Sequence, residues 1–149
     1  MWADVVYGSC MSKLPLLSLT LALITAGCTS KAAALGALAD DSACVVDSDC
    51  CAATDGCSAT SYAVDRGQAE AASDVIDGND GRACVRCIAQ NVVPSCRAGR
   101  CVVTAIGFED EGPGTEAVAD HVVCLAADVE VAAAETDTRA IGCGTVDDE

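Results

Sequence analysis

Cysteine spacing is the feature that most limits what this chain can fold into. Eight cysteines lie within residues 44–101, in the segments CVVDSDCCAATDGC and CVRCIAQNVVPSCRAGRC. The 149-residue chain holds 12 cysteines but few aromatic residues, with Trp 1, Tyr 2 and Phe 1. A small domain without large aromatic side chains has a thin core and usually needs covalent cross-links. The pattern therefore predicts a small disulfide-rich domain over 44–103, with a loop-dominated α+β fold.

Regular secondary structure is expected in only a few places. Asp65 and Gln68 have the spacing of a helix N-cap and its capping-box partner, and apolar residues then recur on one helical face. One short helix is therefore expected over 66–77, with Gly78 ending it. Asp and Ser residues predict loops and turns over 44–57.

Short strands are expected around the second half of the cysteine pattern and beyond it. Pro94 is expected to interrupt a strand over 88–93, and Ala98 with Gly99 is expected to form the turn of the following hairpin. Residues 104–149 then form an acidic C-terminal extension. Alternating apolar residues predict short strands in this extension, at 121–132 and 138–144.

Residues 1–27 have the pattern of an export signal. Met11 begins a short positive region, and LPLLSLTLALITAG over 14–27 is uncharged and mostly apolar. Because a bilayer-spanning helix needs about 20 apolar residues, this shorter segment is typical of a secretory signal peptide. Residues 1–10 carry Asp4 and no positive charge, so Met11 is the expected start of translation.

The end of the leader, LITAGC, resembles the lipobox of bacterial lipoproteins. Ala26, Gly27 and Cys28 match the small residues and the cysteine of that motif. The resemblance implies that Cys28 is lipidated and becomes the mature N-terminus. The small and polar residues that follow predict a tether over 28–43, and a short Ala-rich helix is the alternative there. The lipobox resemblance also implies a location in the bacterial cell envelope, anchored at the outer membrane. The alternative is an ordinary cleaved signal and a secreted protein, with Cys28 as one more disulfide partner.

The number of cysteines is consistent with lipidation. Setting aside Cys10 in the leader and Cys28 leaves 12 − 2 = 10, an even number that can pair completely. The acidic linker FEDEGPGTE divides these cysteines into eight and two, which predicts a Cys124–Cys143 disulfide separate from the main cluster. The predicted disulfide cysteines are Cys44, Cys50, Cys51, Cys57, Cys84, Cys87, Cys96, Cys101, Cys124 and Cys143. Since Cys50 and Cys51 are neighbours, they are expected to bond different partners.

Catalytic and metal-binding patterns are weak. Cys84 and Cys87 form a C-x-x-C pair, but the strand-to-helix context of redox motifs is missing. With Cys96 and Cys101 they could also bind zinc, although thiols of an exported chain oxidise instead. His121, the only histidine, has no nucleophile at a recognisable spacing. We therefore expect no enzyme activity, no metal and no cofactor.

The net charge of −15 disfavours binding to nucleic acid, because phosphates would be repelled. Arg86, Arg97 and Arg100 form the basic patch of the mature chain. This patch is expected to face the acidic residues around the first cysteines, or solvent.

Residues 44–103 resemble the eight-cysteine-cluster domain of predicted bacterial lipoproteins. The matching pieces are CVVDSDC at 44–50, GC at 56–57, YAVDR at 62–66, CVRC at 84–87 and PSCRAGRCV at 94–102. That family has no established activity, so the resemblance implies location and architecture only. The segment CVVDSDCC is also similar, more weakly, to the whey-acidic-protein four-disulfide core, whose members include protease inhibitors.

The sequence thus predicts an exported, membrane-anchored lipoprotein that acts as a non-catalytic binding or structural module. Its partner would be an unidentified protein or envelope ligand. A protease-inhibitor-like module is the second interpretation, and it requires an exposed, disulfide-braced loop. A thiol–disulfide oxidoreductase acting through Cys84 and Cys87 is the third.

Overall fold

The computed structural model describes residues 30–78, 89–107 and 112–142. The predicted leader, the lipidation residue Cys28, and Cys84, Cys87 and Cys143 lie outside these ranges. The described elements are, in order, α1 (Lys31–Asp40), the 3-10 turn η1 (Asp47–Asp49), β1 (Cys50–Asp55), β2 (Thr60–Asp65), the 3-10 turn η2 (Arg66–Gln68), α2 (Ala69–Asp77), β3 (Val92–Arg97), β4 (Arg100–Ala105), β5 (Thr115–Ala119), β6 (Val122–Leu125) and β7 (Ala140–Ile141). No helix in the described ranges is long and apolar enough to cross a membrane.

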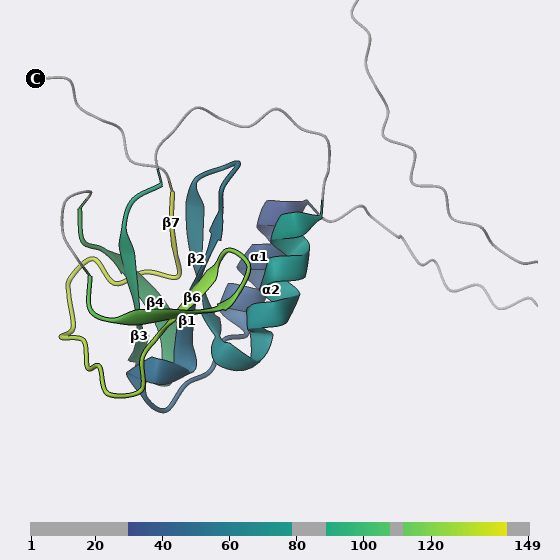
Figure 1. The fold of residues 1–149 in the computed structure, drawn as a ribbon. Helices are drawn as coiled ribbons and strands as arrows, with labels where there is room; N and C mark the ends of the chain where they lie inside the picture. Colours follow the sequence, from purple (N-terminus) through teal and green to yellow (C-terminus); the bar gives the residue numbers. More distant parts are fainter. Residues whose placement is uncertain (1–29, 79–88, 108–111, 143–149) are drawn as a thin grey trace, which may run out of the picture.

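The strands form two antiparallel sheets. A 5-stranded sheet has the order β5-β6-β1-β2-β7, and β3 and β4 form a separate hairpin. The helices α1 and α2 lie together on one side of the larger sheet, and the hairpin lies on the other (Figure 1). The fold is therefore a small disulfide-rich domain as predicted, but it is mostly sheet and contains two α-helices, where loops and one helix were expected.

Strand β1 is the centre of this arrangement, and the prediction of loops over 44–57 is wrong there. Strand β2 pairs with one edge of β1, and β6 pairs with the other. Cys51 and Ala53 belong to the core on the helical side, whereas Cys50 and Ala52 belong to the core on the hairpin side. A strand buried on both faces shows no alternation of apolar and polar residues, so its sequence does not carry the usual strand pattern.

Helix α2 agrees with the prediction. The Asp65 carboxylate accepts a hydrogen bond from the Gln68 backbone N–H at 3.2 Å, as an N-cap does. The chain makes the short turn η2 and then continues as α2, which buries Ala69, Ala72 and Ile76. Gly78 is the C-cap.

Residues 31–40, expected to be part of a tether, form helix α1, which was the alternative for this segment. The Ser30 hydroxyl caps its first turn by accepting from the Ala33 N–H at 3.2 Å. Leu35 is completely buried in the core that α1 shares with α2 and the sheet. The Lys31 ammonium donates to the carbonyl of Ile76 at 2.8 Å, which joins the two helices. An Ala-rich stretch forms a stable helix when a neighbouring surface covers its apolar face.

The β3–β4 hairpin turns where the sequence predicted. Ala98 and Gly99 both have positive φ, at 49° and 77°, as the central residues of a type I′ turn require. Pro94, however, does not interrupt β3. The N–H of Cys96 points away from β4 and donates to Asp47 Oδ1. Because alternate residues share an orientation, the Pro94 nitrogen also points away from β4, and the ladder loses no hydrogen bond.

The C-terminal strands belong to the same sheet as β1 and β2. Strands β5 and β6 form a hairpin, and β6 pairs with β1, while β7 pairs with β2. The strand predicted over 121–132 is shorter in the structure, because β6 ends at Leu125. The strand predicted over 138–144 is represented by β7 and by a bridge between Thr138 and Val103.

Candidate binding loop and disulfide cluster

Three disulfides have both of their cysteines within the described residues. They join Cys44 to Cys96, Cys50 to Cys101, and Cys51 to Cys124. Cys57 is also disulfide-bonded, and no cysteine in the described ranges is free. The prediction of disulfide bonding is therefore confirmed for these residues.

The predicted Cys124–Cys143 disulfide is wrong. Cys124 bonds Cys51, and the two residues are directly opposite each other on the paired strands β6 and β1. Grouping the cysteines along the chain failed because β6 pairs with a strand about 70 residues earlier. The linker in sequence does not separate the extension from the cysteine cluster in space.

The adjacent cysteines Cys50 and Cys51 bond different partners, as predicted. Successive side chains of a strand point to opposite faces, so Cys50 reaches the hairpin while Cys51 lies on the helical side. Cys50–Cys101 therefore attaches the hairpin to the central strand, whereas Cys51–Cys124 links the neighbouring strands β1 and β6 on the helical face of the sheet. This arrangement compensates for the shortage of large aromatic side chains, since Tyr62 is the one aromatic residue in the described core.

The zinc alternative fails on two of its four ligands. Cys96 and Cys101 are bonded to Cys44 and Cys50, so their sulfurs are not thiolates available to a metal. The other two candidates, Cys84 and Cys87, lie outside the described residues, and so does any redox site built on them.

An exposed apolar loop follows the first disulfide. Val45 is 89% exposed and Val46 is 53% exposed, directly after the bonded Cys44. Asp49 Oδ2 accepts hydrogen bonds from the backbone N–H groups of Val45 at 2.8 Å and Val46 at 3.0 Å. These two hydrogen bonds lower the pKa of Asp49. Residues 44–50 are called the valine loop below. Disulfides hold both ends of this loop, and the Asp49 carboxylate holds its middle.

A groove of about 410 Å³ runs between the valine loop and the segment after β6. It is lined by Val45, Val46, Asp47, Ser48, Ala127, Val129, Glu130 and Val131. Asp47 Oδ2 accepts a hydrogen bond from the Val131 N–H at 2.8 Å and so holds the two walls together. Aliphatic side chains therefore face the groove from both walls.

Arg97 forms the ionic centre beneath this groove. Its guanidinium lies 3.2 Å from Asp47 Oδ1 and 3.0 Å from Asp137 Oδ2, and it donates to the carbonyl of Val131 at 2.7 Å. The Arg97 contact with Asp47 confirms that part of the basic patch faces the first acidic group. Arg100 is exposed to solvent, and Arg86 lies outside the described residues.

Burial raises the pKa of Asp137, yet the net shift is downward. Hydrogen bonds from the Thr104 hydroxyl and the Ala134 N–H stabilise the carboxylate, as do the hydrogen bond and the charge of Arg97. Asp137 therefore stays ionised and fixes the 131–137 segment to β3 and β4. The sequence analysis missed both Asp137 and the valine loop. The loop did have a signal, because Val45 and Val46 are adjacent apolar residues in a predicted turn between two cysteines.

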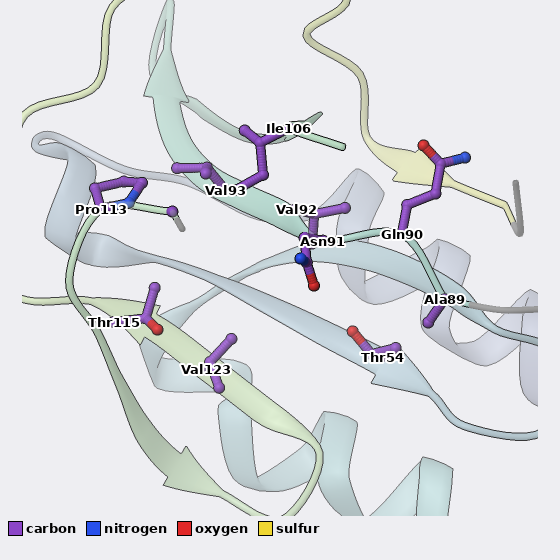
Figure 2. Close-up of a pocket in the computed structure, with 11 residues that line it drawn as sticks. Thr54, Ala89, Gln90, Asn91, Val92, Val93, Ile106, Pro113, Thr115 and Val123 are labelled. Carbon is purple, nitrogen blue, oxygen red and sulfur yellow. The ribbon is translucent and has the colours of Figure 1, made fainter. Parts of the chain in front are cut away.

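A second groove, of about 510 Å³, lies between the hairpin and the larger sheet (Figure 2). Val93 and Ile106 line it from the hairpin side, whereas Thr54 and Val123 line it from the sheet. Its lining includes residues next to both internal gaps in the described chain, namely Ala89 and Gly112. We therefore place no site there.

His121 occupies the β5–β6 turn with a φ of 61°. Its Nε2 atom lies 3.5 Å from Asp77 Oδ1, and both side chains are about half exposed. Among the described residues, no hydroxyl or thiol hydrogen-bonds to its ring. This geometry suits a surface pair between the turn and the end of α2.

Comparison of the chain with family models, curated proteins and solved structures finds no match. The resemblance to the eight-cysteine-cluster domain therefore stays a prediction. The geometry of the valine loop is the basis for a functional assignment.

Proposed function

We propose that this chain is a non-catalytic binding module of the bacterial cell envelope, which contacts a protein partner through the valine loop. The observation that carries the proposal is the 89% exposure of Val45 between two disulfide-bonded cysteines. Apolar groups gathered on a surface commonly mark interaction sites.

The valine loop is also pre-organised for binding. Its ends are cross-linked, and its backbone is hydrogen-bonded to Asp49. A loop that is already ordered loses little conformational entropy when a partner binds, so more of the apolar contact contributes to affinity. The adjoining groove offers further aliphatic surface at Val129 and Val131.

Export and anchoring through Cys28 remain part of the proposal, supported by the leader pattern. More than one acyl chain is needed for stable anchoring, at about 0.8 kcal/mol per buried CH₂. We expect Cys28→Ala to abolish labelling by a metabolic acyl probe and to release soluble protein. Equal labelling of variant and wild type would contradict lipidation.

Site-specific photo-cross-linking in cells tests the binding role. A photoreactive residue replaces Val45 in one variant and Ala71, an exposed residue of α2, in the matched control. We expect a discrete cross-linked protein with the probe at 45 and none with the probe at 71. The same adducts at both positions, or no adduct at 45, would contradict a binding role for the valine loop.

A protease-inhibitor role is the second candidate, since the valine loop is the exposed, disulfide-braced loop that such a role requires. Val46 has extended backbone angles, with φ −128° and ψ 162°. However, the N–H groups of Val45 and Val46 are bonded to Asp49 and are not free to pair with a protease backbone.

Serine proteases that prefer small aliphatic side chains provide the test of this candidate. Inhibition by the wild-type protein that is lost in Val45→Asp and retained in Ala71→Asp would favour it over the general binding role. The oxidoreductase interpretation depends on Cys84 and Cys87, which lie outside the described residues.

A further inference from the structure

Two disulfides of this protein lie close to each other. The sulfur atoms of Cys44, Cys50 and Cys96 all lie within 4.8 Å of one another, although they belong to the separate disulfides Cys44–Cys96 and Cys50–Cys101. We propose that these four cysteines form a thiol–disulfide exchange site. At this site a small thiol converts the pair of bonds into Cys44–Cys50 and Cys96–Cys101.

The two disulfides differ in their access to solvent. Cys44 and Cys96 are partly exposed, whereas Cys50 and Cys101 have no exposed surface. A thiol in solution can therefore attack the Cys44–Cys96 bond directly, since access to sulfur controls the rate of exchange. The buried bond is reached through the sulfur atoms of the accessible one.

The strand register of the hairpin suits the alternative Cys96–Cys101 bond. Cys96 lies directly opposite Cys101 in the β3–β4 ladder. The Cys96 N–H donates to Asp47 rather than across the ladder, so the two residues form a non-hydrogen-bonded pair. Such pairs have Cα atoms about 4.5 Å apart, within the range of about 4.4–6.8 Å found for disulfides.

The exchange balances in three steps. A small thiolate attacks the sulfur of Cys96, which forms a mixed disulfide there and releases the Cys44 thiolate. The Cys44 thiolate attacks the sulfur of Cys50, which forms Cys44–Cys50 and releases the Cys101 thiolate. The Cys101 thiolate then attacks the mixed disulfide on Cys96, which forms Cys96–Cys101 and returns the small thiolate. Two disulfides are present before and after, so no net oxidation or reduction occurs.

The exchange would change how the valine loop is attached. Cys44–Cys96 ties the loop to β3, and Cys50–Cys101 ties β1 to β4. After the exchange, the loop would close on itself through Cys44–Cys50, and the hairpin would close on itself through Cys96–Cys101. The hairpin would then be held to the central strand by non-covalent contacts. The exchange does not depend on the proposed binding role.

The first test uses the wild-type protein with a catalytic amount of glutathione at about pH 8.5, where a typical thiol is half ionised. The reaction is stopped with acid, free thiols are alkylated, and a non-reduced peptide map is made with trypsin and an Asp-specific protease. We expect linked Cys44–Cys50 and Cys96–Cys101 peptides to appear as the original links decrease. Retention of the original links alone, or reduction without the new links, would overturn the proposal.

A variant tests the central step without added thiol. Cys96→Ser leaves a thiol on Cys44, beside the sulfur of Cys50. We expect part of the alkylation to appear on Cys101, together with a Cys44–Cys50 link; alkylation confined to Cys44 contradicts the step. The matched control is Cys124→Ser, which frees Cys51 on the opposite face of β1. In this control the alkylated cysteine should be Cys51 alone. Alkylation of any of the four clustered cysteines would mean that exchange is unspecific and would contradict a defined exchange site.

Discussion

Asp137 shows how one carboxylate orders an irregular segment. It accepts from the Thr104 hydroxyl and the Ala134 N–H, and Arg97 joins it to Asp47. The contacts of Asp137 with Arg97 and Thr104 are not local in sequence, since these residues are 40 and 33 positions away. The groove beside the valine loop depends on them, because they hold the 131–137 segment in place.

Replacing Asp137 should change how stability depends on pH. The pKa of Asp137 is lower in the folded protein than its usual value, so its stabilising effect is present above the unfolded pKa of about 3.9 and is lost as pH falls through the folded pKa. We expect Asp137→Asn to be less stable than wild type at pH 7 and to approach it at low pH. Denaturant unfolding at a series of pH values measures this.

The matched control for Asp137→Asn is Asp74→Asn, which changes an exposed carboxylate of α2. It should unfold like wild type at each pH. A wild-type advantage over Asp137→Asn that stays constant down to low pH would contradict the role of the ionised carboxylate.

At the scale of elements, the two helices depend on different signals. Helix α2 is amphipathic and follows the turn η2, which Asp65 caps, whereas α1 is alanine-rich and has one completely buried leucine, Leu35. The stability of α1 therefore comes from the surface it covers, while the start of α2 is set by residues next to it.

The Asp65 cap of η2, the turn that leads into α2, can be tested with two substitutions. Asp65→Ala removes the acceptor for the Gln68 N–H and should lower the free energy of unfolding by about 0.5–2 kcal/mol. Asp65→Asn keeps an acceptor and should retain most of the stability. Equal losses for the two variants, measured by thermal or denaturant unfolding, would assign the effect to charge rather than capping.

The docking of α1 can be tested at its buried leucine. Leu35→Ala should lower the free energy of unfolding by about 2–5 kcal/mol, because it opens a cavity beneath the helix. Leu38→Ala removes the same atoms from a partly buried position and should cost less. If neither substitution changed the unfolding midpoint, residues 31–40 would behave as the tether first expected.

At the scale of the molecule, helices and a hairpin cover the two faces of β1, and disulfides from two of its residues attach it to other strands. Cys50 connects it to the hairpin and Cys51 connects it to β6. The C-terminal strands are therefore part of the main sheet, and the molecule should unfold as one unit.

Removal of the Cys51–Cys124 disulfide tests whether the molecule unfolds as one unit. The double variant Cys51→Ser/Cys124→Ser should lower the free energy of unfolding by about 2–4 kcal/mol and reduce amide protection in β1 and β2 as well as β6. The control Ala43→Ser/Ala133→Ser adds two hydroxyls at exposed positions. Loss of protection confined to residues after 104 would indicate a separate extension.

Several features followed from the sequence alone because their causes lie between near neighbours. The cap and apolar face of α2, the turn at Ala98 and Gly99, and the divergent bonding of Cys50 and Cys51 are of this kind. The need for disulfides followed from the number of cysteines and the shortage of aromatic residues. These signals depend on local backbone preference and composition, which the chain carries wherever it folds.

Tertiary structure alone decided which segment became the central strand, which cysteines paired and whether residues 31–40 folded. Burial of β1 on both faces depends on helices and a hairpin that cover it from elsewhere in the chain. Cys124 could be matched to Cys51 only once β6 lay beside β1. The exposure of Val45 likewise reflects what the rest of the fold leaves uncovered. Contacts between residues far apart in sequence have no local signature, because their energy exists only after the surfaces meet.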